Sequence, residues 1–175
     1  MGRTLKGHAS VDQVLQVFRG DSKVEEVTNL WPNTAVERVA LVAQAHRPAD
    51  RILGLAWELW EFDKEEFRKN VYAVWSKTDT DPIHSWTFGE MFDYIDANHT
   101  WVPQPFDPKK WAAVQSWRPG MKFSPPKKIG PLIAYEERAG RIELEDGHTR
   151  LMAAHLEGVF PPIIQLYIGK RPSTF

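Results

Sequence analysis

The chain has 175 residues, of which 42% are hydrophobic and 26% are charged, and this composition is ordinary for a soluble globular protein. A formal net charge of -1 provides no overall attraction for nucleic acid, so any contact with DNA must be local. The sequence contains no cysteine, which excludes disulfides and thiolate metal sites and fits a reducing cytoplasm. Because no segment has the apolar length of a signal peptide or a membrane span, we expect a cytoplasmic protein without a membrane span.

Most of the sequence before Val102 has the apolar spacing of amphipathic helices. Each segment opens with a residue whose short polar side chain can cap a helix. The predicted helix starts are Ser10, Asn33 or Thr34, Asp50, Asp63 and Thr87. In the segment that opens at Asp50, the apolar residues from Ile52 to Trp60 recur at helical spacing, and we expect this segment to be one of three antiparallel helices.

The composition changes around Val102, where prolines begin to interrupt the helical pattern. We place a boundary there, between a helical N-terminal region of residues 1–102 and a C-terminal domain of residues 103–175. The two regions could also form one compact unit.

A basic and aromatic stretch follows this boundary. From Asp107 to Lys128, lysine and arginine greatly outnumber acidic residues, and tryptophan and phenylalanine lie between them. Basic residues that follow a phosphate backbone and aromatic side chains that stack on bases are the two components of a single-stranded nucleic-acid groove. The alternative is a solvated basic loop whose tryptophans fill the join between the two regions. The predicted DNA contacts are Lys109, Lys110, Trp117, Arg118, Lys122, Lys127 and Lys128.

Further along the chain, a hairpin leads into a turn that can hold a phosphate. A strand from Leu132 to Tyr135 and an alternating strand that ends at Glu145 predict the hairpin, and the residues behind Arg150 repeat at helical spacing. Between strand and helix, Gly147 lets the backbone bend closely around a ligand. The amides at a helix start and the forked guanidinium of Arg150 both stabilise an anion there.

The C-terminal part of the chain resembles the signature of the ParB/sulfiredoxin superfamily. The resemblance lies in the run from Ile142 to Gly158, which reads Ile-Glu-Leu-Glu-Asp-Gly-His-Thr-Arg-Leu-Met-Ala-Ala-His-Leu-Glu-Gly, and in the hydrophobic strand that follows it. The family pattern is strand, Gly-x-x-Arg, helix with small residues, Gly and hydrophobic strand. Members bind a nucleoside triphosphate with this turn. By resemblance, the nucleotide-binding residues of this chain are Gly147, His148, Thr149 and Arg150.

Two branches of the superfamily differ from this chain at the turn. Sulfiredoxin has its catalytic cysteine in the position of His148, and partition proteins, which hydrolyse CTP, have a second arginine in place of Thr149. The Asp-Gly-His-x-Arg form is similar to a free-serine kinase and to plasmid-encoded fertility-inhibition proteins of the oncogenic-suppression (Osa) type. For the latter group the resemblance implies ATP hydrolysis, DNA cleavage and interference with conjugative plasmid or T-DNA transfer in the bacterial cytoplasm. A protein partner in the DNA transfer machinery is also expected.

Acidic residues around the turn suggest a metal-assisted reaction on ATP. Asp146 and Glu145 are the predicted ligands of Mg²⁺, which would bridge the phosphates. Glu136, Glu137 and Asp146 are the candidate catalytic carboxylates that orient the attacking water or hydroxyl.

His148 and Arg150 complete the predicted catalytic set. The imidazole of His148 could bind phosphate or act as a base, and the guanidinium of Arg150 would neutralise charge on the transferred phosphoryl group.

Each of these residues also has a structural explanation. Asp146 could cap the following helix through the amide of His148 or Thr149, and His148 could be only a polar surface residue. Arg150 could form a surface ion pair with Glu143 or Glu145, which contributes little.

Taken together, the sequence predicts an α+β protein, with a helical N-terminal half packed on a small C-terminal mixed sheet of ParB/sulfiredoxin type. The expected function is that of a nucleoside-triphosphate-binding hydrolase, an ATPase with DNase activity as a further expectation. One alternative is a non-catalytic protein-binding inhibitor that keeps the domain as a scaffold. Another is a small-molecule kinase that transfers phosphate to free serine.

Overall fold

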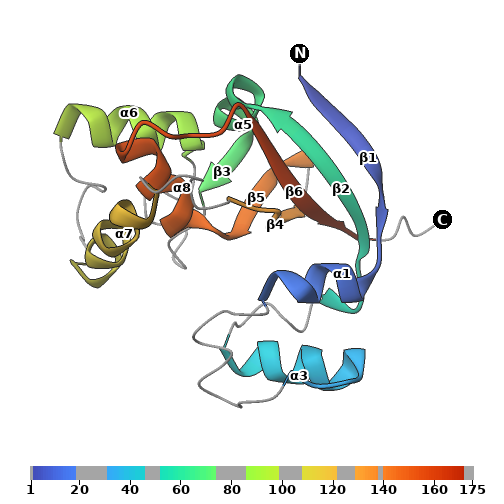
Figure 1. The fold of residues 1–175 in the computed structure, drawn as a ribbon. Helices are drawn as coiled ribbons and strands as arrows, with labels where there is room; N and C mark the ends of the chain where they lie inside the picture. Colours follow the sequence, from blue (N-terminus) through green and yellow to red (C-terminus); the bar gives the residue numbers. More distant parts are fainter. Residues whose placement is uncertain are drawn as a thin grey trace.

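The computed structural model describes residues 2–18, 31–45, 52–73, 86–98, 108–121, 129–137 and 140–171. In this part of the chain, six strands form one mixed sheet, which helices cover on both faces (Figure 1). From edge to edge, the strands are β1 (Arg3–Ala9), β2 (Ala56–Asp63), β6 (Ile163–Lys170), β4 (Leu132–Glu136), β5 (Ile142–Asp146) and β3 (Val71–Ala73). The pairs β4 with β6 and β3 with β5 are parallel, and the other three pairs are antiparallel.

The helices form two groups. One consists of α1 (Val11–Leu15), the short 3-10 helix η1 (Gln16–Phe18) and α3 (Ala35–Ala45). The other consists of α5 (Lys64–Asn70), α6 (Phe88–Asn98), α7 (Pro108–Met121) and α8 (His148–Leu156). Figure 1 shows the first group below the sheet and the second group at its β3 and β5 end. None of the helices in the described residues combines the length and the apolar character that crossing a membrane requires.

Strand β4 shows how one sheet serves two hydrophobic cores. Leu132 and Ala134 contact the larger core, to which α5, α6, α7 and α8 contribute, whereas Ile133 and Tyr135 contact the smaller core under α1 and α3. All four side chains are buried, as the alternation of side chains along a strand requires when both faces are covered. The sheet is therefore the middle layer between the two groups of helices.

Four of the predicted helix starts are confirmed. Ser10 and Thr87 each form a reciprocal capping box with the residue three positions later, and Thr34 does the same with Glu37. The side chain of Asp63 accepts a hydrogen bond from the amide of Glu66 at the start of α5. These caps give the amides at each helix start a partner, which is why the short polar residues mark the helix boundaries so well.

The expectation of a purely helical N-terminal region is wrong. Residues 56–60, predicted as part of the helix opening at Asp50, lie in β2, and β1 and β3 also come from this region. Strand β2 contacts both cores, through Trp57 on one side and Phe62 on the other, so its apolar residues do not follow a strict alternation. Three strands of the sheet come from before Val102 and three from after it, and Val102 itself lies outside the described residues.

The segment after the predicted boundary is also more regular than expected. Helix α7 occupies residues 108–121 of the proline-rich stretch. Pro108 is its first residue, a position at which the missing N–H of proline costs no helical hydrogen bond. Val114 of this helix is buried in the larger core. The fold class is thus mixed, compatible with the predicted α+β type, with helices packed on a six-stranded sheet rather than on a small C-terminal one.

Candidate functional site

The turn between β5 and α8 has the geometry that the sequence predicts. Gly147 is the N-cap of α8, with φ 108° and ψ 4°, and no side chain caps the helix start. A left-handed backbone of this kind strongly favours glycine. A Cβ atom at Gly147 would also overlap the side chain of Leu132 on the neighbouring strand. The backbone amides of the first turn of α8 therefore follow a bend that only glycine accommodates.

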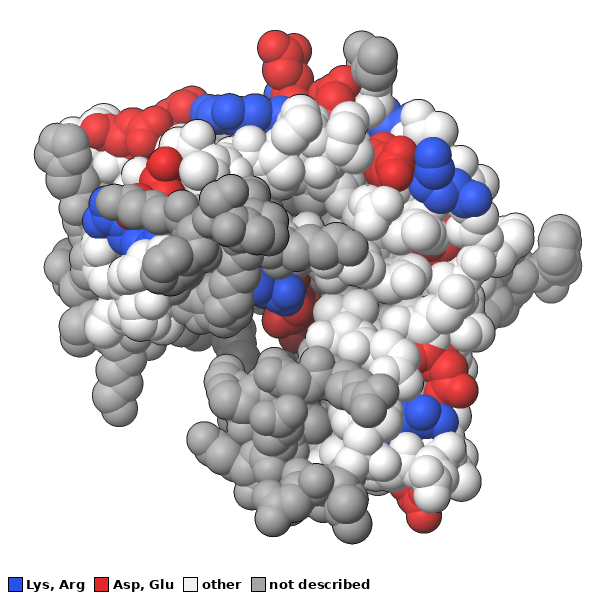
Figure 2. All heavy atoms as spheres, viewed as in Figure 1, with Lys and Arg blue, Asp and Glu red and all other residues white. Residues whose placement is uncertain are grey.

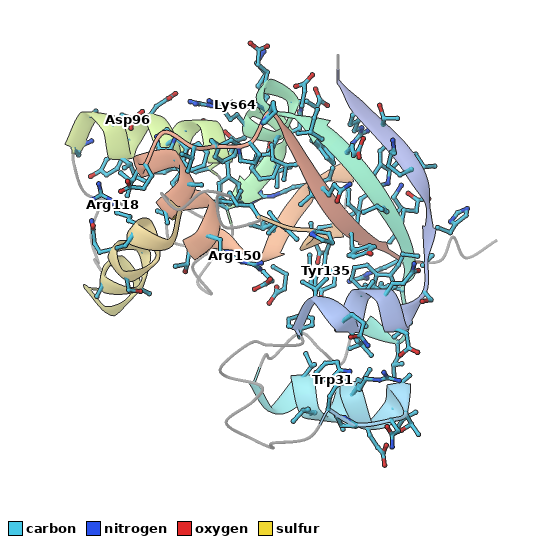
Figure 3. All side chains as sticks on the ribbon, viewed as in Figure 1. Trp31, Lys64, Asp96, Arg118, Tyr135 and Arg150 are labelled. Atoms are coloured by element: carbon cyan, nitrogen blue, oxygen red, sulfur yellow. The ribbon has the colours of Figure 1, made fainter. Side chains whose placement is uncertain are left out.

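Asp146 and Arg150 form an ion pair across this turn. The guanidinium of Arg150 donates a hydrogen bond to the carboxylate of Asp146, and the two side chains are 21% and 19% exposed. In Figure 3 the side chain of Arg150 extends from the start of α8 toward the side on which α1 lies. The alternative in which Asp146 caps the helix is wrong, because Gly147 is the N-cap. The structural alternative for Arg150 was a surface ion pair with Glu143 or Glu145, and in the structure its ion-pair partner is Asp146.

An irregularity in the sheet decides where Asp146 lies. Ala134 of β4 pairs with Leu144 of β5, and the preceding residue, Ile133, pairs with Asp146. Strand β5 therefore contains one extra residue, Glu145, between the two pairs. Such β-bulges redirect side chains at functional sites. Directly paired residues share a face of the sheet, so Asp146 lies on the face of Ile133, which packs against the smaller core. The bulge thus places the carboxylate on the side of the sheet that α1 and α3 cover.

Figure 2 shows that this side is hollowed. Between the part of the molecule with the sheet and the part with α3, a recess exposes basic and acidic atoms side by side.

His148 is part of the packing of the turn. Its side chain is only 6% exposed, and its ring lies 5.7 Å from that of Phe88 in α6. The interpretation as a polar surface residue is therefore wrong. A buried ring that contacts an aromatic side chain is better suited to fixing the start of α8 against α6 than to taking protons from solvent. Thr149, next to it, is half-buried.

The structure does not bring Glu136 and Glu137 to the turn. Glu136 pairs with Ile142 at one end of the β4–β5 hairpin, whereas Asp146 pairs with Ile133 at the other end. The amide of Glu137 bonds to the carbonyl of Arg141, which closes the hairpin at that far end. Of the predicted catalytic residues, Asp146, His148 and Arg150 are adjacent to the turn, and the two glutamates are not.

Glu136 instead belongs to a charge cluster that the sequence did not reveal. Lys170 lies 2.8 Å from Glu58 and 3.2 Å from Glu136, and its ammonium is 5.2 Å from the ring centre of Trp60. Burial alone would lower the pKa of Lys170, but the two carboxylates outweigh it and raise the pKa. Burial alone would raise the pKa of Glu58, but hydrogen bonds from Lys170 and Trp60 lower it. The residues come from three strands, so no spacing in the sequence indicates them.

Two other described arginines, which lie at the far end of the hairpin and at the far end of α8, are also paired with carboxylates. Arg141 lies 2.8 Å from Glu143 and over the ring of Tyr72, and Arg118 lies 2.5 Å from Glu157 at the end of α8. Figure 2 shows basic and acidic residues interspersed over this view rather than gathered into a patch of one sign.

The predicted DNA contacts fall mostly outside what can be described. Arg118, on α7, is held by Glu157 and by Gln115. Lys109, Lys110 and Trp117 are in α7, but their side chains lie outside the described residues, as do Lys122, Lys127 and Lys128 entirely.

The donor atoms at the turn are of the kind that Mg²⁺ and a polyphosphate require. Within the described ranges, no three His, Asp or Glu side chains gather into a metal-binding cluster. Mg²⁺ bound with a nucleotide needs only one or two carboxylates, because phosphates and water complete its shell. The half-buried carboxylate of Asp146, with Glu145 beside it in the bulge, meets that requirement. Arg150 and the amides of α8 supply donors for phosphate oxygens.

Comparison of the chain with protein-family models, curated proteins and solved structures found no match.

Proposed function

We propose that the chain binds ATP with Mg²⁺ at the turn between β5 and α8 and hydrolyses it. The observation that carries this proposal is the position of the Arg150 guanidinium at an uncapped helix start, directly after a left-handed glycine. The amides of the first turn and the positive end of the helix dipole favour a bound phosphate.

Within this proposal, each residue of the turn has a separate role. Arg150 binds a phosphate oxygen and neutralises the charge that develops on the transferred phosphoryl group. Asp146 would hold the cation and orient the attacking water, since Glu136 and Glu137 lie at the far end of the hairpin. His148 positions the start of α8 through its contact with Phe88. A bound Mg²⁺ would supply Lewis-acid stabilisation of the phosphates.

The proposal extends to DNA cleavage and to interference with conjugative DNA transfer. Its support is the resemblance of residues 142–168 to the ParB/sulfiredoxin signature, together with the basic and aromatic residues of the α7 segment.

The test is calorimetric binding of ATP with Mg²⁺ to the wild-type protein and to Arg150→Ala. We expect the substitution to abolish binding. The matched control is Arg68→Ala, because Arg68 also forms an ion pair with an aspartate, Asp93 at 2.6 Å, but on α5 and α6. If Arg150→Ala binds ATP as the wild type does, the site is assigned wrongly.

A further inference from the structure

Strand β1 is an edge strand with both faces open to solvent. Its seven residues pair with β2 on one side, and within the described ranges no strand pairs with the other side (Figure 1). All four side chains from Arg3 to Lys6 are exposed, although successive side chains of a strand point to opposite faces of the sheet. An uncovered edge of this length is a place where an extended segment of another chain can add a strand.

The hydrogen bonds to β2 show which backbone groups of β1 are directed to the open edge. The amide of Asp63 donates to the carbonyl of Gly2, just before β1 begins. In an antiparallel pair, neighbouring residues direct their N–H and C=O groups alternately toward the paired strand and away from it. The N–H and C=O of Arg3 therefore point away from β2, and those of Leu5 do the same.

The charges of β1 define the kind of strand that fits there. Residues 2–9 include arginine, lysine and histidine but no aspartate or glutamate. Lys6 lies 3.2 Å from Glu61, but their side chains are 45% and 27% exposed, and such a surface pair contributes little. The guanidinium of Arg3 lies 5.4 Å from the ring centre of Trp60, and no ion pair connects it to a carboxylate of the described residues. Because opposite charges on facing strands stabilise their pairing, an acidic strand fits this edge best.

Two features of β1 disfavour a second copy of this chain as the occupant. The register shifts between Leu5 and Gly7, so Lys6 is an extra residue in a β-bulge. Lysines and bulges at an edge oppose indiscriminate pairing, and two copies of β1 would also bring like charges together. Neither feature opposes an acidic strand. Leu5, which is 44% exposed and pairs with Trp60, adds an apolar position between the two basic residues.

We propose that the open edge of β1 binds an extended acidic segment of a partner protein as an additional strand. Main-chain hydrogen bonds to Arg3 and Leu5 hold the segment. An apolar residue of the segment faces Leu5, and its acidic residues face Arg3 and Lys6. Strand β1 and the pair β5 and β3 lie at opposite ends of the sheet, so this interaction is independent of the turn before α8.

The first experiment tests the charge preference by fluorescence anisotropy with two blocked synthetic peptides, each as long as β1. One alternates glutamate and threonine around a central valine, and the other has lysine in place of glutamate. We expect the wild type to bind the acidic peptide at least about tenfold more tightly. In the double variant Arg3→Gln and Lys6→Gln, we expect this preference to fall to within about threefold. The matched control is Arg68→Gln with Lys69→Gln, which removes as much positive charge from α5 and keeps the preference.

The second experiment tests the backbone contacts with Leu5→Pro. Proline lacks an N–H, but the N–H of Leu5 points away from β2, so the substitution removes a donor from the open edge alone. We expect binding of the acidic peptide to weaken at least about tenfold. The matched control, Leu5→Ala, keeps the N–H and is expected to bind within about threefold of wild type. If Leu5→Pro does not fold, ¹⁵N-labelled wild type replaces it, and the peptide is expected to shift the amides of Arg3 and Leu5 most.

Three results would overturn the inference. The first is a folded wild type that binds neither peptide, or both equally well. The second is equal binding of the acidic peptide by Leu5→Pro and Leu5→Ala, or amide shifts that gather away from β1. The third is a dimer in sedimentation velocity that Leu5→Pro dissociates, because a second copy would then occupy the edge.

Discussion

The side chain of Leu132 occupies the space that a Cβ atom would need at Gly147. Leu132 is fully buried in the larger core, between β4 and the helices that cover it, and it pairs with Leu166 of β6. The conformation of the turn is therefore coupled to the packing of the sheet. The turn is not a loose loop attached to the domain, and a change at Gly147 affects both.

Replacing Gly147 by alanine is predicted to destabilise the protein by about 2–4 kcal/mol, because it combines an unfavourable backbone conformation with overpacking. The matched control is Gly158→Ala, at the other end of α8. Gly158 also has a positive φ, of 68°, but a Cβ atom there meets nothing within 4 Å, so we expect a loss of only about 1 kcal/mol. Urea unfolding measures both. Equal losses of unfolding free energy in the two variants would show that the Leu132 side chain moves aside without an energetic cost.

Replacing Glu136 by glutamine is predicted to leave the rate of ATP hydrolysis within about twofold of wild type, since a catalytic carboxylate must lie within hydrogen-bond reach of its water. Glu136 lies 3.2 Å from Lys170 at the far end of the hairpin. The measurement is release of inorganic phosphate, with free serine present in a parallel reaction to detect transfer to a hydroxyl. A large loss of rate in a folded Glu136→Gln protein would place that carboxylate in the reaction after all.

Replacing Glu58 by glutamine is predicted to lower the free energy of unfolding near neutral pH and to have less effect in acid. The pKa of Glu58 in the folded protein lies below its ordinary value of 4.5. A carboxyl of this kind stabilises the fold above its unfolded pKa, and the contribution is lost as the pH falls through the lowered folded pKa. Urea unfolding over a pH series measures it.

The control for this series is Glu65→Gln. Glu65 is 87% exposed and lies 4.0 Å from Lys69, so its pair contributes little. If Glu58→Gln lowered stability by the same amount at every pH, the ion pair with Lys170 would not be the cause.

Arg118 is predicted to act in folding rather than in DNA binding. Its partner Glu157 has a side chain only 4% exposed, so Arg118→Gln leaves a buried carboxylate and costs about 1–3 kcal/mol. We expect binding of single-stranded oligonucleotides, measured by fluorescence anisotropy, to weaken with Lys109→Gln and Lys110→Gln together and to show a smaller salt dependence. If Arg118→Gln weakened oligonucleotide binding more than it lowered the free energy of unfolding, the assignment of Arg118 to folding would be contradicted.

The parts of the fold that the sequence predicted are those with a local cause. Caps at Ser10, Thr34, Asp63 and Thr87 mark helix starts because each satisfies amides within one turn. The bend at Gly147 is predictable for the same reason, since its φ of 108° is a property of a single residue.

The strands that the sequence missed depend on distant neighbours. Strand β1 lies at the edge of the sheet and is mostly exposed, so it has no buried face to produce an apolar alternation. In β2, Trp57 and Phe62 enter different cores, and the resulting apolar run has the spacing of a helix. Pairing with β1 and β6 makes this segment a strand rather than a helix. Strand β6 begins one hundred residues further along the chain, so a local pattern cannot reveal this pairing.

The candidate site likewise combines features with a local cause and features that depend on distant residues. The turn residues are neighbours in sequence, so their proximity could be predicted. The pairing of Arg150 with Asp146 depends on the extra residue Glu145 in the β4–β5 ladder, and the distance of Glu136 from the turn depends on the register of that ladder. Neither follows from spacing alone.

The most direct test of the nucleotide site is a titration of ¹⁵N-labelled protein with ATP and Mg²⁺, followed by NMR through the backbone amides. We expect saturable shifts at the amides of Gly147, His148, Thr149 and Arg150, with small shifts at α3 and at the Glu58–Lys170 cluster. A folded protein whose turn amides do not move at saturating ATP, or whose shifts gather elsewhere, would contradict the central claim that the start of α8 binds the phosphates.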